Sequence, residues 1–146
     1  MKTIKKSIEI SAPKESVWAV LLEDAYSRDW MSFFMPGTRA KTDWIEGHKI
    51  AFVDNSNNGI VGKITEKKPY ERLVFTYDGM IYNGVEDFES ENSKAMKGVT
   101  ESYRLSSKEG ATLLEIESGM DDDNFEEMSK AWESALQRIS ELSHAI

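Results

Sequence analysis

Apolar and polar residues alternate at the start of the chain, where Ile4, Ile8 and Ile10 share one parity. This spacing of two places the isoleucines on one face of a strand, so the pattern predicts a strand over residues 4–10. After the segment SAPKES, the apolar residues Val17, Val20 and Leu21 follow at helical spacing and predict a short helix. A second short helix is predicted over residues 23–30, and Pro36-Gly37 ends the segment.

Between residues 38 and 120 the pattern changes to alternating strands separated by turn residues. Turns that recur every 8–12 residues between alternating segments are typical of an antiparallel meander. Residues 80–98 show no clear period, which predicts a long loop with a functional or mobile role. The six predicted strands in this region cover residues 38–44, 48–54, 60–68, 71–79, 99–107 and 112–118.

The last part of the chain carries one apolar stripe at steps of three and four residues, which predicts a long amphipathic helix. Such a helix must bury its stripe, and one face of the predicted sheet is the available partner. We therefore predict a single α+β domain over residues 1–146, with two short helices after the first strand and a curved antiparallel sheet of about seven strands around the C-terminal helix. The stripe consists of Phe125, Met128, Trp132, Leu136, Ile139, Leu142 and Ile146.

Composition excludes several classes of protein. The 146 residues contain no cysteine, so neither a disulfide framework nor a thiolate nucleophile is possible. The formal net charge of −8 opposes nucleic-acid binding, because basic residues supply most of the affinity for phosphate. The longest apolar run, residues 17–22, is too short for a secretory signal or a membrane span. We therefore expect a cytoplasmic protein.

The sequence contains no recognisable motif for binding a metal or a cofactor. The chain has two histidines, His48 and His144, which lie far apart and lack metal-binding spacing. No nucleophile elbow, phosphate-binding loop or dinucleotide fingerprint is present. We expect no metal, no cofactor and no conventional catalytic constellation.

The segment GKITEKKPYERLVFTY, residues 62–77, resembles a motif of the activator-of-Hsp90-ATPase-like branch of the START/Bet v 1-type helix-grip proteins (SRPBCC superfamily). In that motif a glycine, a glutamate, a proline and an apolar-aromatic strand recur at about this spacing. The family often has a second proline where this chain has Tyr70, and a tryptophan where it has Tyr77. The opening IEISAPKESVWAVLLEDAYSRDWM, the hairpin VTESYRLSSKEGATLLEI and the closing AWESALQRISEL also match the family.

The resemblance implies a helix-grip fold with a cavity between sheet and terminal helix. The bulky half of the stripe, Phe125, Met128 and Trp132, would face this cavity, while the aliphatic half would close the core. Methionine adapts to irregular apolar shapes, which suits a wall around a ligand. Strand residues Phe75, Tyr77 and Tyr103 would form further walls.

Two interpretations remain for the aromatic residues before Pro36-Gly37. Phe33, Phe34 and Met35 stand where loops are usually polar. An apolar loop beside a cavity indicates a rim or lid of a binding site. The alternative is simple packing of the loop against the domain.

Glu101 is the most specific single candidate for a ligand-binding residue. It shares strand parity with Tyr103 and Leu105, which places a carboxylate on the apolar face. A carboxylate on that face needs either a partner or a raised pKa. Glu101 would then orient a ligand, unless it reaches solvent at the strand end or a bulge reverses the parity.

Three functions are compatible with these features. The leading hypothesis is a binding domain for a small apolar or amphipathic molecule. The second is a chaperone partner that stimulates an Hsp90-type ATPase, as the resemblance implies. The third is a cyclase or hydrolase that uses Glu101 with a tyrosine as acid and base. The sequence leaves the ligand and the oligomeric state, monomer or homodimer, open.

Overall fold

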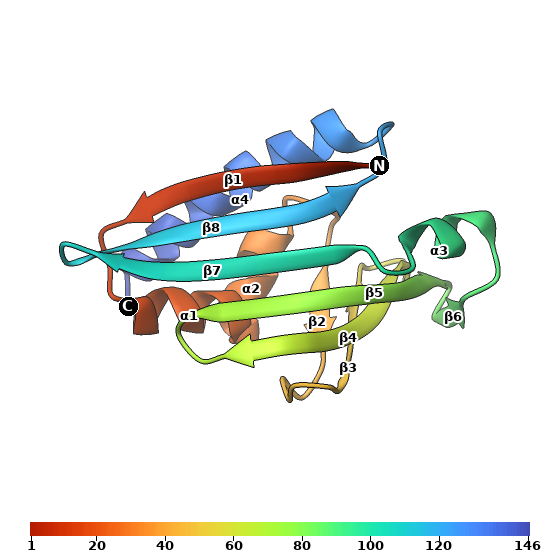
Figure 1. The fold of residues 1–146 in the computed structure, drawn as a ribbon, viewed down its shortest axis with the longest axis horizontal. Coiled ribbons are helices and arrows are strands. Elements are labelled where there is room, and N and C mark those ends of the chain that lie inside the picture. The colour runs from red at the N-terminus through yellow and green to blue at the C-terminus, as the bar shows by residue number, and fades with distance from the viewer.

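The first strand of the chain returns beside the last one, so that β1 pairs with β8 in a curled antiparallel sheet (Figure 1). The computed structural model describes all residues from 1 to 146. The strand order is β1-β8-β7-β5-β4-β3-β2, and the short β6 pairs with β5. The strands are β1 (Lys2–Ile10), β2 (Arg39–Lys41), β3 (Lys49–Val53), β4 (Gly59–Lys68), β5 (Arg72–Tyr82), β6 (Val85–Asp87), β7 (Thr100–Lys108) and β8 (Ala111–Met120).

Three of the four helices pack together on one face of the sheet, and the fourth lies at its end (Figure 1). Helices α1 (Lys14–Leu22) and α2 (Asp24–Met31) follow β1, and both contact α4 (Phe125–His144). Helix α3 (Glu91–Met96) packs against β5. None of these helices is both long enough and apolar enough to cross a membrane.

The stripe on α4 builds the core. Trp132, Leu136 and Ile139 are all less than 5% exposed and join the inward residues of the sheet in one apolar cluster. Burying an aliphatic side chain of this size contributes about 1.5–3 kcal/mol relative to leaving it in water. The predicted α+β helix-grip fold, with its terminal helix held by a curved antiparallel sheet, is confirmed.

The segment 80–98 is more ordered than its sequence pattern predicts. Strand β5 continues through it to Tyr82, and β6 and α3 follow. Polar contacts hold this segment: the fully buried Ser93 donates to Asp87 at 3.0 Å, and its own N–H bonds to the Ser90 hydroxyl. Hydrogen bonds from the Ser90 hydroxyl, the backbone N–H groups of Glu89 and Ser90, and the Ser93 hydroxyl lower the pKa of Asp87. The prediction of a long loop was wrong because hydrogen bonds, not an apolar period, organise these residues.

At Tyr70 the β4–β5 hairpin has a backbone conformation that the second proline of the family motif could not adopt. Tyr70 has a φ of 67° and its ring lies 6.1 Å from that of Trp18. A proline, whose φ is held near −65°, cannot adopt this conformation. At Gly62 the strand pairing is irregular, and an added Cβ would lie 2.3 Å from the carbonyl oxygen of Thr76. The glycine therefore permits a close approach at the point where the sheet bends.

A bidentate ion pair fixes α2 to α4. The guanidinium of Arg138 donates to the two carboxylate oxygens of Asp29 at 2.8 and 2.9 Å. The contact lowers the pKa of Asp29, and two parallel bonds set the geometry more strictly than a point charge does. The loop that follows α2 is thereby held beside the first half of α4.

We expect Ile139→Ala to lower the free energy of unfolding by about 2–5 kcal/mol, because Ile139 is fully buried beneath the sheet. Gln137→Ala, on the exposed side of the same helix, should change it by less than about 0.5 kcal/mol. Urea denaturation of both variants measures the difference. Equal losses would mean that the stripe on α4 does not carry the core.

Candidate ligand-binding pocket

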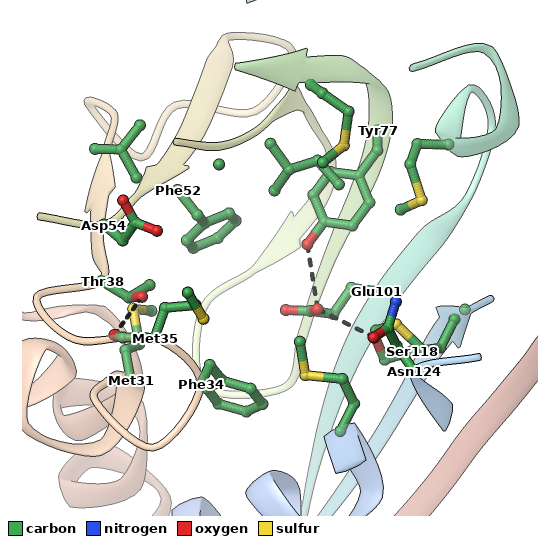
Figure 2. Close-up of a pocket in the computed structure, with 18 of the residues that line it drawn as sticks. Met31, Phe34, Met35, Thr38, Phe52, Asp54, Tyr77, Glu101, Ser118 and Asn124 are labelled. Atoms are coloured by element: carbon green, nitrogen blue, oxygen red, sulfur yellow. Dashed lines mark hydrogen bonds between the residues drawn. The ribbon is translucent and has the colours of Figure 1, made fainter. Parts of the chain in front are cut away.

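A pocket of about 390 Å³ opens between the sheet, the end of α2 with its following loop, and the first half of α4 (Figure 2). Fourteen of its 23 lining residues are hydrophobic. Pockets that hold small organic molecules typically measure about 300–1,000 Å³ and have mostly apolar walls with a few polar groups. Both the size and the lining therefore suit a small ligand.

Aromatic rings form one wall of the pocket around Trp132. The ring of Phe34 meets the indole edge-on at a centroid distance of 4.9 Å, and the ring of Tyr103 lies 6.0 Å away. Trp30, from the end of α2, lies 6.1 Å from the same indole. The edge-to-face contacts of Phe34 and Tyr103 hold these rings in fixed orientations against the indole. The wall is thus a rigid surface contributed by three separate elements and a loop.

Methionines supply much of the rest of the lining. Six of the seven methionines in the chain border the pocket. Their unbranched, polarizable side chains adapt to irregular apolar shapes. Of these, Met128 was predicted as a wall residue and Met35 as part of the rim before Pro36-Gly37. The other four are scattered along the chain and share no local pattern. The six are Met31, Met35, Met80, Met96, Met120 and Met128.

Glu101 on β7 is the polar centre of the pocket. Its Oε1 accepts hydrogen bonds from the hydroxyls of Tyr77 at 3.1 Å and Ser118 at 3.3 Å, and its Oε2 accepts one from Tyr103. Figure 2 shows the Tyr77 and Ser118 hydroxyls directed at this carboxylate. The parity argument places Glu101 correctly: its side chain lies on the inner face with Tyr103 and lines the pocket.

Burial dominates the electrostatics of this centre. It raises the pKa of Glu101, although the three hydroxyl bonds lower it in part. Burial and the neighbouring carboxylate raise the pKa of Tyr77 and of Tyr103 well above their ordinary value. Both tyrosines therefore stay protonated, and their hydroxyl groups donate hydrogen bonds to Glu101. No lysine, arginine or histidine lines the pocket.

The structure brings together six of the nine predicted ligand-binding residues. Phe34, Tyr77, Glu101, Tyr103, Met128 and Trp132 all line the pocket.

Phe75, Phe33 and Phe125 are not part of the lining. Phe75 is 2% exposed and covered by the rings of Phe52 and Tyr103, so it belongs to the core behind the wall. Phe33 is 46% exposed, because the turn after α2 directs its neighbour Phe34 inward instead. Phe125 begins α4, where the ammonium of Lys2 lies 5.2 Å from its ring centroid.

Several polar lining residues had no signal in the sequence. Asp54 follows β3 and accepts the backbone N–H groups of Ser56 and Asn58. Asn124 precedes α4, and its amide nitrogen lies 3.0 and 2.9 Å from the two carboxylate oxygens of Asp121. These residues lie in turns, whose polar character is ordinary, and only the fold reveals that the turns border one pocket.

Comparison with known proteins identifies the family. The family model described as "Activator of Hsp90 ATPase homolog 1-like protein" matches residues 11–144, nearly the whole chain. No curated protein sequence matches the chain significantly.

Solved structures show the same fold at low sequence identity. The Aha1 dimer from Colwellia psychrerythraea superposes with a TM-score of 0.72 at 17% identity, covering 96% of this chain and 94% of that one. A protein from Mesorhizobium loti gives 0.73 at 16% identity, over 97% and 96% of the two chains. An AHSA1-like protein from Aeromonas hydrophila gives 0.67 at 16% identity, over 97% and 92%. These likenesses concern the fold alone.

The raised pKa of Glu101 predicts a pH-dependent stability difference from Glu101→Gln. Because the folded chain binds this proton more tightly than the unfolded chain, its stability should fall as pH rises above about 4.5, the ordinary value for a glutamate. The Glu101→Gln variant has no ionisable group at this position and so lacks this pH-dependent contribution to stability. At pH 7 we therefore expect Glu101→Gln to be neutral or stabilising, and at pH 4.5 to lose that advantage.

Urea denaturation at several pH values measures this difference. Glu117→Gln, an exposed change on the neighbouring strand β8, removes the same formal charge and serves as the control. A difference between wild type and Glu101→Gln that does not vary with pH would place the Glu101 carboxylate in water.

Proposed function

This chain belongs to the activator of Hsp90 ATPase homolog 1-like family, and we propose that it acts as a small-molecule binding domain. An apolar or amphipathic ligand would occupy the space between the sheet and α4. The observation that carries the proposal is the pocket itself: a mostly apolar lining of suitable volume that surrounds one hydrogen-bonded carboxylate. Apolar walls supply affinity for such a ligand, and a few polar groups fix its orientation.

The division of α4 into two halves supports this proposal. Met128 and Trp132 line the pocket, whereas Leu136 and Ile139 are buried in the core one and two turns further on. A helix serving only as core would pack solidly along its length. Here the helix and sheet separate toward the helix N-terminus and leave a space that a ligand can fill.

We expect the neutral fluorescent probe N-phenyl-1-naphthylamine to bind with enhanced emission, since this emission rises in apolar surroundings. Met128→Ala should weaken its binding about three- to tenfold, because part of the contact between ligand and wall is lost. Ile139→Ala is the matched control on the same helix. Measured well below its melting temperature, this core variant should bind the probe as wild type does.

Absence of probe binding to the wild-type protein would contradict the proposal. Equal losses of affinity in Met128→Ala and Ile139→Ala would also contradict it, because binding would then follow stability rather than contact with the pocket.

A second candidate is interaction with a chaperone ATPase, which the family description favours. Three exposed apolar side chains, Tyr82, Val85 and Phe88, gather on and beside the β5–β6 hairpin and offer a surface for a partner protein. Scattered apolar residues are ordinary on a surface, but a group on one hairpin is typical of protein contacts.

The two candidates predict opposite effects of two variants. If a chaperone is the partner, Phe88→Ser should reduce stimulation of an Hsp90 ATPase and leave N-phenyl-1-naphthylamine binding unchanged. Met128→Ala should do the reverse. ATPase assays with both variants beside the wild type make the comparison, and no stimulation by the wild type would exclude this candidate.

A further inference from the structure

We propose that the pocket selects a protonated apolar amine and rejects apolar acids of the same shape. This inference rests on the proposed binding function and specifies the chemical class of its ligand. It follows from the sign of the charges around the pocket and from the use of every hydrogen-bond donor at its polar centre.

The charged residues of the lining all have one sign. Asp54, Glu101 and Asp121 border the pocket, and none of the 18 lysines and arginines of the chain does. The N-terminus of α4 lies nearby, and its dipole alone would favour an anion. Acidic residues outnumber the cations at that end: residues 121–123 before the helix are aspartates, and its first turn carries Glu126 and Glu127. The cations there are the N-terminal ammonium, which pairs with Asp122, and Lys2, which lies over the ring of Phe125. An anionic ligand therefore meets repulsion both at the centre and at this side of the pocket.

The centre around Glu101 offers acceptors and no free proton. The hydroxyl protons of Tyr77, Tyr103 and Ser118 are all directed to its carboxylate. A carboxylate has about four lone-pair positions, of which these bonds occupy two on Oε1 and one on Oε2. The remaining position on Oε2 requires a donor from the ligand. An ammonium group can donate an N–H to this position, and its positive charge can serve as the counterion of the carboxylate.

The other side-chain donors of the lining are mostly engaged elsewhere. Thr38 donates to the carbonyl of Met35, the indole of Trp30 donates to a backbone carbonyl, and the amide of Asn124 bonds Asp121. The indole N–H of Trp132 and the amide of Asn58 remain, and both are neutral. A ligand carboxylate would lose its hydration here and gain no charged partner, which is unfavourable.

The uncharged walls favour a cation as well. Rings of Tyr77, Tyr103, Phe34 and Trp132 border the same space. Aromatic faces attract cations and repel anions through their quadrupole, and the methionine sulfurs are polarizable. The apolar part of an amine thus finds dispersion contacts, while its ammonium meets Glu101.

A matched set of naphthalenes that differ only in one substituent tests the inference by isothermal titration calorimetry at pH 7. The compounds are 1-naphthalenemethylamine, which is protonated, 1-naphthalenemethanol, which is neutral, and 1-naphthoate, which is an anion. We expect the amine to bind at least about tenfold more tightly than the alcohol, as a hydrogen bond to a charged group provides. The acid should bind more weakly than either.

Glu101→Gln should remove this preference. The amine should lose about tenfold in affinity, the alcohol should change less than about threefold, and the acid should improve. Glu117→Gln, which alters the net charge equally on the exposed β8 surface, should leave all three affinities unchanged.

Each other outcome overturns a distinct statement. If the alcohol or the acid binds as tightly as the amine, the charge preference is wrong while the binding function stands. If Glu117→Gln weakens the amine as much as Glu101→Gln does, general attraction and not the pocket centre is responsible, and the preference is again wrong. If none of the three compounds binds and N-phenyl-1-naphthylamine also fails, the binding function itself is wrong.

Discussion

The packing of α4 against the inner face of the sheet places the two helical walls of the pocket, α4 itself and the end of α2. Leu136 and Ile139 close the core in the second half of this helix, and the ion pair of Arg138 with Asp29 holds α2 beside it. With that half fixed, the first half of α4 must follow the helix axis while the sheet curves away. Side chains from the sheet, α2 and α4 line the resulting space.

The carboxylate of Glu101 lowers the stability of the fold at this position, so its presence there points to a role other than packing. A carboxylate transferred from water to an apolar site is destabilising unless hydrogen bonds replace its hydration. Two tyrosines and a serine provide such bonds, yet no cation accompanies them. A side chain with a purely structural role at this position would not need a charge. A buried charge without a counterion is typical of a functional site, where a ligand can supply the opposite charge.

The sequence predicts the fold better than the site, and the reason is physical. The stripe on α4 and the spacing of turns are local patterns, and the parity of Glu101 is fixed by its own strand. The methionine wall assembles from residues that are far apart in the chain, so no local pattern carries it. Phe75 shares a face with Tyr77, but only the packing of Phe52 over it decides that it lies behind the wall. Around Asp87 and Ser93 the chain forms a short strand and a helix instead of the predicted loop. Polar contacts hold these elements, and such contacts leave no periodic pattern of apolar residues in the sequence.

The net charge of −8 gives the whole surface an attraction for cations, but it cannot by itself produce the selectivity that we propose for the pocket. At physiological ionic strength, interactions between exposed charges are screened beyond about 8 Å. Exposed carboxylates such as Glu117 therefore act weakly and on every cation alike. A ligand ammonium bonded to Glu101 would stand at contact distance from this carboxylate, where the interaction is much stronger than with the distant carboxylates of the surface. The discrimination that we propose between an amine and an acid thus depends on Glu101 and the hydroxyls that hold it.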